Sequence, residues 1–197
     1  MMKIHGDGNS GNCLKVKWVC DALALPYTWI DVDTMTGGSR TVEFLKLNPW
    51  GQVPTIEFDD GRTLAQSNAI IRYLARGSAL IPADAYAAAR MDEWLFWEQY
   101  SHEPYIAVCR FQMVYLKKPA SGLDPEKVKR GHAALARMEQ HLAASRFLAA
   151  EAVSLADVSL LAYTRVAHEG GFDLAGYPSV RRWIGETENA LGLPPAK

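Results

Sequence analysis

The chain has 197 residues, with 21 Lys and Arg against 22 Asp and Glu, and 49% of its residues are hydrophobic. This length fits one large or two small globular domains, and a net charge of −1 provides no basic surface for nucleic acid or an anionic membrane. No run of about 18 apolar residues could span a bilayer, and the N-terminus has no apolar signal-peptide stretch. We therefore expect a cytoplasmic protein.

The three cysteines are an odd number without the spacing of a metal site. Cys13 and Cys20 fall in one predicted helix, so they would lie roughly 10 Å apart along its axis, which is beyond disulfide reach. With Cys109 they are expected to be reduced thiols in a reducing compartment. No metal is expected.

The first 76 residues alternate between strand-like apolar segments and segments with helical spacing. Leu25-Pro26 closes the first of the helices. The predicted elements are a strand at 3–5, a helix at 13–25, a strand at 27–32, a short helix at 41–47, a strand at 55–58 that a tight hairpin turn at 59–62 joins to a second strand, and a helix that opens at 66. The order β-α-β-α-β-β-α is that of a thioredoxin-like α/β domain.

The segment at 48–67 combines two features suited to a peptide-like anion. Val53 precedes Pro54 and is therefore restricted to an extended conformation, which leaves its N–H and C=O able to pair with a ligand backbone. Gln66 and Ser67 stand at the start of a predicted helix, where unpaired N–H groups and partial positive charge favour a carboxylate.

After residue 85 no strand-like alternation appears, so the second half is predicted to be all-α. Residues 77–85 have the composition of a linker. The segment at 86–116 is long, helical and aromatic, and Pro104 is expected to kink or break it. Further helices are predicted from Asp124-Pro125 to about 144 and from Tyr177-Pro178 to 191. Six ring-bearing side chains of this segment are noted: Trp97, Tyr100, His102, Tyr105, Phe111 and Tyr115. Most of them are expected in the core, and a few are expected to face the first domain and form an apolar pocket.

Ser154 and Asp157 have the spacing of a capping box, and Val153 and Val158 flank them as a hydrophobic staple would. Such a box contributes about 1 kcal/mol. It indicates a helix start and by itself says nothing of function.

Two runs carry a resemblance to a known family. The chain reads Asn-Pro-Trp-Gly-Gln-Val-Pro-Thr from residue 48 and Gln-Ser-Asn-Ala-Ile-Ile-Arg-Tyr-Leu from residue 66. These runs resemble the N-terminal domain of cytosolic glutathione transferases, and the Ser-x-x-Asp box is similar to one in their helical domain. The resemblance implies a thioredoxin-like glutathione-binding domain at 1–76, a linker at 77–85 and an all-helical domain at 86–197.

The resemblance also implies roles for individual residues. In that family the X-Pro bond is cis, so Val53 would pair with the cysteinyl backbone of glutathione beside a cis Pro54. Gln66 and Ser67 would hold the γ-glutamyl carboxylate and amine. Gln52 and Arg40 would contact the glycyl carboxylate. His102 and Glu103 of the helical domain would approach the γ-glutamyl group, in the same chain or across a dimer interface.

The loop before the first helix would supply the group that activates the glutathione thiol. Lowering a thiol pKa by about two units requires about 2.7 kcal/mol of preference for the anion, which one or two hydrogen bonds to a charged acceptor can supply. Ser10 is the first candidate, because it matches the position of the hydroxyl in serine-type family members. Asn12 is the second, since an amide also donates. Cys13 is the third, because a helix start would lower its pKa and allow a mixed disulfide.

The implied function is conjugation of the glutathione thiolate to an apolar electrophile, in detoxification, by a cytoplasmic homodimer. The loop contains no Tyr, so the chain departs from tyrosine-type members. Two alternatives stay open. One is a glutathione-dependent disulfide reductase or dehalogenase that uses Cys13 or the bound thiolate. The other is a non-catalytic, glutathione-transferase-like binding protein.

Overall fold

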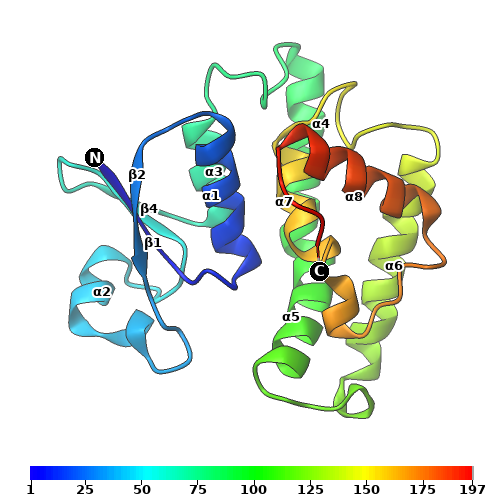
Figure 1. Ribbon diagram of the computed structural model, residues 1–197, viewed down its shortest axis with the longest axis horizontal. Helices are drawn as coiled ribbons and strands as arrows, with labels where there is room; N and C mark the ends of the chain where they lie inside the picture. The colour runs from blue at the N-terminus through cyan, green and yellow to red at the C-terminus, as the bar shows by residue number, and fades with distance from the viewer. Residues whose placement is uncertain (197) are drawn as a thin grey trace. The chain divides into compact units, whose positions relative to one another are not determined.

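The computed structural model describes residues 1–196, which form two compact units (Figure 1). The first unit is Met1–Ser78, and the second begins at Ala79. The segment expected to be a linker belongs mostly to the second unit. Leu80 is buried there, and its carbonyl accepts the N–H of Leu155 at 3.0 Å.

The first unit contains a four-stranded sheet in the order β2-β1-β3-β4. Its strands are β1 Met2–Gly6, β2 Tyr27–Asp31, β3 Thr55–Glu57 and β4 Thr63–Ala65. Strand β2 is parallel to β1, whereas β3 is antiparallel to both β1 and β4. Ile4 and Ile56 face each other in register and have no solvent exposure, so the middle of the sheet is apolar.

Three α-helices cover this sheet. They are α1 Gly11–Ala22, α2 Val42–Leu47 and α3 Ser67–Leu74. Helices α1 and α3 lie side by side on one face of the sheet, and α2 lies on the other (Figure 1). The element order confirms the predicted thioredoxin-like arrangement. Because α1 and α3 are neighbours, residues at their first turns can meet although they are far apart in the sequence.

The second unit is helical, and its described residues contain no strand, as predicted. Its helices are α4 Ala85–Trp97, a π-helical turn at Glu98–His102, α5 Glu103–Val114, α6 Pro125–Leu142, α7 Leu155–Thr164 and α8 Pro178–Ala190. Helix α7 is buried along its whole length and contacts α4, α5 and α8. It is therefore the central helix of this unit.

Pro104 does not end the long aromatic segment. It lies in the first turn of α5, and the chain passes from α4 to α5 through the π-helical turn. Proline cannot donate a hydrogen bond to the preceding turn, and a wider turn accommodates that loss. Of the aromatic-segment side chains named above, Tyr100 is 82% exposed and Phe111 is 43% exposed, so these two lie outside the core.

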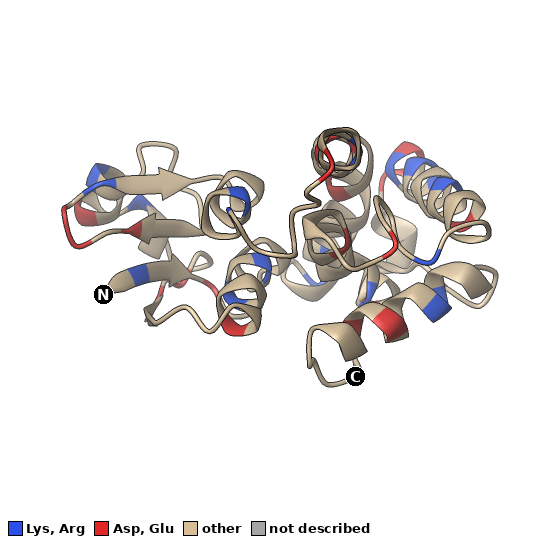
Figure 2. Cartoon of the chain, turned by 90° about the horizontal axis from the view of Figure 1, so that it is seen from above, with Lys and Arg blue, Asp and Glu red and all other residues tan. Residues whose placement is uncertain are grey.

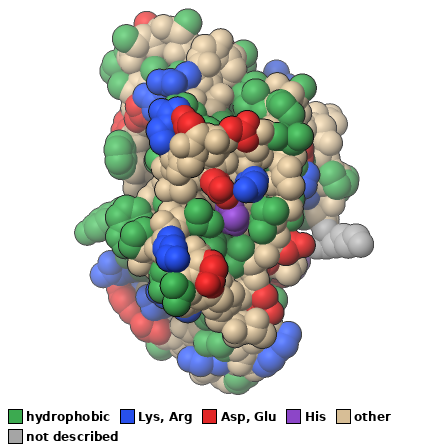
Figure 3. Space-filling view, turned by 90° about the vertical axis from the view of Figure 1, so that its left-hand side faces the viewer, with side chains coloured by type: hydrophobic (Ala, Val, Ile, Leu, Met, Phe, Trp, Pro, Cys, Tyr) green, Lys and Arg blue, Asp and Glu red, His purple; other side chains and the backbone are tan. Residues whose placement is uncertain are grey.

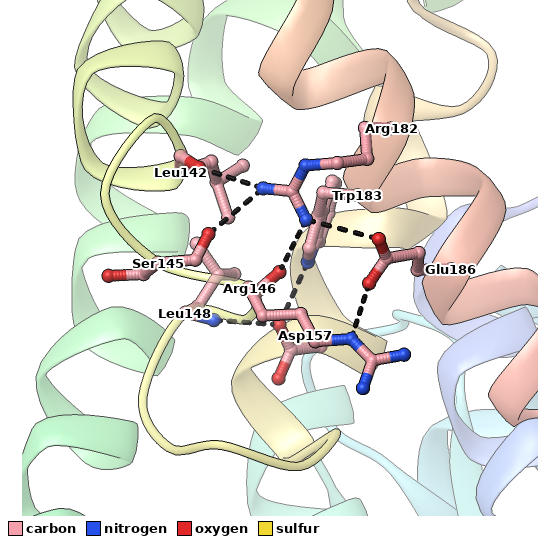
Figure 4. A network of polar contacts seen from close by, with 8 residues as sticks. All are labelled: Leu142, Ser145, Arg146, Leu148, Asp157, Arg182, Trp183 and Glu186. Atoms are coloured by element: carbon pink, nitrogen blue, oxygen red, sulfur yellow. Dashed lines mark hydrogen bonds and ion pairs between the residues drawn. The ribbon is translucent and has the colours of Figure 1, made fainter.

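The predicted capping box forms at the start of α7. The Asp157 carboxylate accepts the backbone N–H and the hydroxyl of Ser154, each at 2.9 Å. It also accepts the N–H of Leu148 at 2.9 Å and the indole N–H of Trp183 at 2.8 Å (Figure 4). The box therefore does more than start a helix, because it connects α7 to α8 and to the preceding loop.

Arg182 connects α8 to the end of α6 in the same region (Figure 4). Its guanidinium donates to the carbonyls of Leu142 at 2.7 Å and Ser145 at 2.9 Å. A cation is favoured at a helix C-terminus, where carbonyls lack intrahelical partners. Glu186 pairs with Arg146 at 2.6 Å and so holds the following loop.

Charged residues of both signs are interspersed along the elements (Figure 2). One face of the molecule, seen in Figure 3, shows the same mixture of acidic, basic and apolar side chains, without a large area of one sign. No helix in the described part of the chain is long and apolar enough to cross a membrane.

Candidate functional site

The loop before β3 contains the cis peptide bond between Val53 and Pro54. Asn48 organises this loop from inside, because its side chain is 1% exposed and its amide donates to the Gln52 carbonyl at 2.7 Å and to the Thr55 hydroxyl at 3.1 Å. In the sequence, Asn48 marks only the start of a motif. The structure shows that its buried amide holds both ends of the loop around Val53.

Gln66 joins β4 to α3 with an unusual backbone conformation, at φ 71° and ψ 110°. A non-glycine residue at positive φ costs on the order of 1–3 kcal/mol, and such residues cluster at functional sites. The Gln66 side chain is exposed and its amide donates to the side-chain oxygen of Gln52 at 3.5 Å. The structure therefore brings these two candidates together beside the cis bond.

The first turns of α1 and α3 meet at Asn12 and Ser67. The Ser67 hydroxyl, which is 5% exposed, donates to Oδ1 of Asn12 at 3.1 Å. Lys15 donates to the same oxygen at 2.9 Å. Two helix N-termini thus converge beside Lys15, and a helix N-terminus favours a negatively charged ligand.

Ser10 is the N-cap of α1, but its side chain does not cap the helix. Its carbonyl accepts the N–H groups of Cys13 at 3.0 Å and Leu14 at 2.9 Å, while its half-buried hydroxyl lies within hydrogen-bond reach of the Cys13 thiol. A hydroxyl that the helix does not need for capping can turn towards a ligand.

Cys13 does not have the lowered pKa that its place at a helix start led us to expect. Burial raises the pKa of its thiol to about 11, despite a hydrogen bond from the N–H of Asp7 at 3.4 Å. The loss of hydration outweighs the helix N-terminus. A raised pKa disfavours the thiolate, so the structure gives no support to a reactive Cys13. Cys20 and Cys109 are likewise free and buried.

Arg40 packs against the loop that carries Trp50 and Gly51. Its guanidinium donates to the Trp50 carbonyl at 3.1 Å. Gly51 has φ 63°, and a Cβ there would lie 2.5 Å from the Arg40 guanidinium. Only glycine combines that backbone conformation with so close a contact. Arg40 is exposed, so its charge is available to a ligand carboxylate.

The structure does not support the expected ligand contact of His102. This side chain has no solvent exposure, and its Nε2 bonds to the Thr164 hydroxyl at 2.9 Å. That hydroxyl donates onward to the Leu160 carbonyl at 2.7 Å, so His102 belongs to the interior of the second unit. Glu103 follows it as the first residue of α5 and is half-buried. Among the described residues, no group of three or more His, Cys, Asp or Glu side chains could hold a metal ion.

Comparison with known proteins gives the family. The model of the glutathione S-transferase N-terminal domain matches residues 9–76, and the model of the C-terminal domain matches residues 83–186. The chain belongs to the glutathione S-transferase family. It is 30% identical to glutathione S-transferase 3 of Zea mays over 98% of this chain and 96% of that protein.

Solved structures of bacterial family members have the same fold. A glutathione S-transferase from Pseudomonas fluorescens Pf-5 is 43% identical, with a TM-score of 0.92 over 95% of this chain and 94% of that one. One from Xanthobacter autotrophicus Py2 is 40% identical, with a TM-score of 0.91 over 100% and 96% of the two chains. The glutathione transferase fold predicted from the sequence is therefore confirmed.

Lys15 is a residue of this site that was not among the candidates predicted from the sequence. It stands between apolar helix positions, a pattern typical of a solvated residue, but it has no solvent exposure. The available signal was its spacing, because residues three apart lie on the same helix face and Lys15 follows Asn12 by three.

Proposed function

We propose that this protein is a glutathione transferase that binds glutathione in its first unit, stabilises the thiolate at the start of α1 and transfers it to an apolar electrophile. The observation that carries the proposal is the meeting of the α1 and α3 N-termini at Asn12 and Ser67. Family membership makes glutathione the natural ligand of this arrangement.

The binding proposal assigns one part of the tripeptide to each group of residues. The backbone of Val53 pairs with the cysteinyl backbone, as in strand addition. The γ-glutamyl carboxylate accepts from the first N–H groups of α3 at Ser67, with Gln66 beside it. At the other end, Arg40 and Gln52 hold the glycyl carboxylate. The Arg40 guanidinium, fixed on the Trp50 carbonyl, supplies the charge for that end.

Thiol activation is assigned to Ser10, with Asn12 as a second donor. The thiol loses its proton to solvent, and a hydrogen bond from the Ser10 hydroxyl stabilises the thiolate. The sulfur then attacks the electrophilic carbon and forms a C–S bond. A leaving group departs in a substitution, or a proton is taken up in an addition. A charge-assisted hydrogen bond contributes about 1.5–3 kcal/mol, which lowers the thiol pKa by about one to two units.

A homodimer is proposed from the exposed aromatic face of α4 and the turn that follows it. Tyr86 is 75% exposed, Phe96 is 76% exposed and Tyr100 is 82% exposed. Tyr86 and Phe96 lie on α4, and Tyr100 lies in the π-helical turn that follows it. An exposed aromatic stripe favours association, and a second copy of the same face is the simplest partner in a two-fold assembly. Cytoplasmic detoxification of small electrophiles is the proposed role.

A Cys13-based reductase is not favoured, because the buried thiol has a raised pKa. A non-catalytic binding protein is not favoured either, because Gln66 keeps a strained backbone at the ligand site.

The proposal is tested by calorimetric titration with glutathione and by turnover of an activated aryl chloride. Wild type is expected to bind and turn over. Ser67→Ala is expected to lose about tenfold in affinity, since one buried hydrogen bond is lost. Ser10→Ala is expected to bind normally and to lose turnover. A wild type that fails to bind millimolar glutathione would contradict the proposal.

A further inference from the structure

Lys15 is fully buried beside the proposed glutathione site and none of the proposed contacts uses it. Lysine is almost never fully buried unless its ammonium is held by partners. Its Nζ lies 2.9 Å from Oδ1 of Asn12, on the same face of α1. Removing an ammonium from water is strongly unfavourable, so a buried lysine must be held by polar partners, and Asn12 is one of them.

The contact with Lys15 fixes the orientation of the Asn12 amide. An ammonium only donates hydrogen bonds, so the amide atom that faces it must be the oxygen. The Ser67 hydroxyl donates to that same oxygen at 3.1 Å. The other end of the Asn12 amide therefore carries N–H donors. The Ser67 hydroxyl already donates its hydrogen to Asn12, so it can only accept a hydrogen bond from any further partner.

We infer that Lys15 is a positioning residue that sets the direction of the hydrogen bonds at the glutathione site through Asn12. The Asn12 amide is held as a donor, the polarity that a thiolate requires. Ser67 is held as an acceptor, the polarity that the γ-glutamyl ammonium requires. The inference rests on the proposed function, and it adds a residue that acts on the ligand through another side chain.

Lys15→Met separates this role from ordinary packing, because methionine keeps the long unbranched side chain and removes the donor and the charge. The matched control is Lys17→Met on the same helix. Lys17 is half-exposed and pairs with Asp21 at 2.6 Å, away from Asn12. Lys15→Arg keeps the donor and the charge and serves as the rescue variant.

Asn12→Asp provides a second and independent test. An aspartate at this position still accepts from Lys15 and Ser67, so a purely structural role survives and the added ion pair favours folding. It has no N–H to donate, and its negative charge repels a thiolate. Thiol activation should therefore be lost while thermal stability is retained.

The readout is the thiol pKa of bound glutathione, measured from thiolate absorbance against pH, together with kcat and KM for glutathione. We expect Lys15→Met to raise this pKa by about one unit. At pH values below the pKa, the thiolate fraction should then be up to about tenfold smaller than in wild type. Lys15→Arg is expected to recover part of the loss, and Lys17→Met to match wild type. Asn12→Asp is expected to raise the pKa at least as far while remaining as thermally stable as wild type.

A folded Lys15→Met protein with the wild-type thiol pKa and KM would overturn the inference. If Lys15→Met does not fold, Asn12→Asp decides, and a wild-type pKa in that variant overturns it. A wild-type protein that binds glutathione without lowering its thiol pKa would instead overturn the proposed function, and this inference with it.

Discussion

Asp157→Asn tests the buried network that connects α7 to α8. One carboxylate oxygen accepts the Leu148 N–H at 2.9 Å and the Trp183 indole at 2.8 Å, and the other accepts two bonds from Ser154 at 2.9 Å each. Asparagine has nearly the same shape but only one acceptor oxygen. When the amide oxygen faces Leu148 and Trp183, the amide nitrogen faces Ser154. The Ser154 hydroxyl can then turn and accept, but the Ser154 backbone N–H loses its acceptor.

The expected loss follows from that one backbone donor. A buried donor without a partner costs about 1–3 kcal/mol, so Asp157→Asn should lower the free energy of unfolding by about 1–3 kcal/mol. Urea denaturation followed by circular dichroism measures this difference. The control is Glu151→Gln, the same change at an exposed residue, which should stay within about 0.5 kcal/mol of wild type. An Asp157→Asn protein as stable as that control would refute the reasoning.

Three further predictions follow from single features. Gln66→Gly releases the backbone strain of φ 71° and should raise the free energy of unfolding by up to about 1 kcal/mol while weakening glutathione binding. Melting curves measure the stability and calorimetry measures the binding, and wild-type values of both would contradict this prediction. Burial lowers the pKa of His141, so the folded state binds fewer protons than the unfolded state, and stability should fall as the pH drops from about 6.5 through the lowered value. Urea unfolding at pH 7.5 and 5.5 should show this fall in wild type and a smaller one in His141→Gln, and equal falls would contradict it. Phe96→Asp combined with Tyr100→Asp should give a folded monomer in analytical ultracentrifugation, whereas an unchanged dimer would show that this face is not the interface.

The sequence predicted most of the fold because local rules agree with the packing. Apolar residues such as Ile4 and Ile56 mark strands that are buried in the sheet. The proline and glycine positions end the elements where the structure ends them, to within two or three residues. Ser154 and Asp157 form the predicted capping box because both partners are local in the sequence.

The electrostatics of the site could not be predicted in the same way, because burial is set by residues far apart in the sequence. Cys13 stands at a helix start, but packing removes its hydration and raises the pKa. Lys15 has the sequence signature of a solvated helix position, and His102 that of a candidate ligand, yet both are fully buried. Burial of this kind decides whether a polar residue binds a ligand or supports one that does.

The thiol pKa of bound glutathione tests the central claim most directly. Absorbance of the thiolate is recorded against pH for glutathione bound to wild type and to Ser10→Ala. The proposed site predicts a bound thiol pKa about two units below that of the free thiol in wild type, equal to about 2.7 kcal/mol, and a value raised by at least one unit in Ser10→Ala. A wild-type value equal to that of free glutathione would contradict the assignment of thiolate stabilisation to the start of α1.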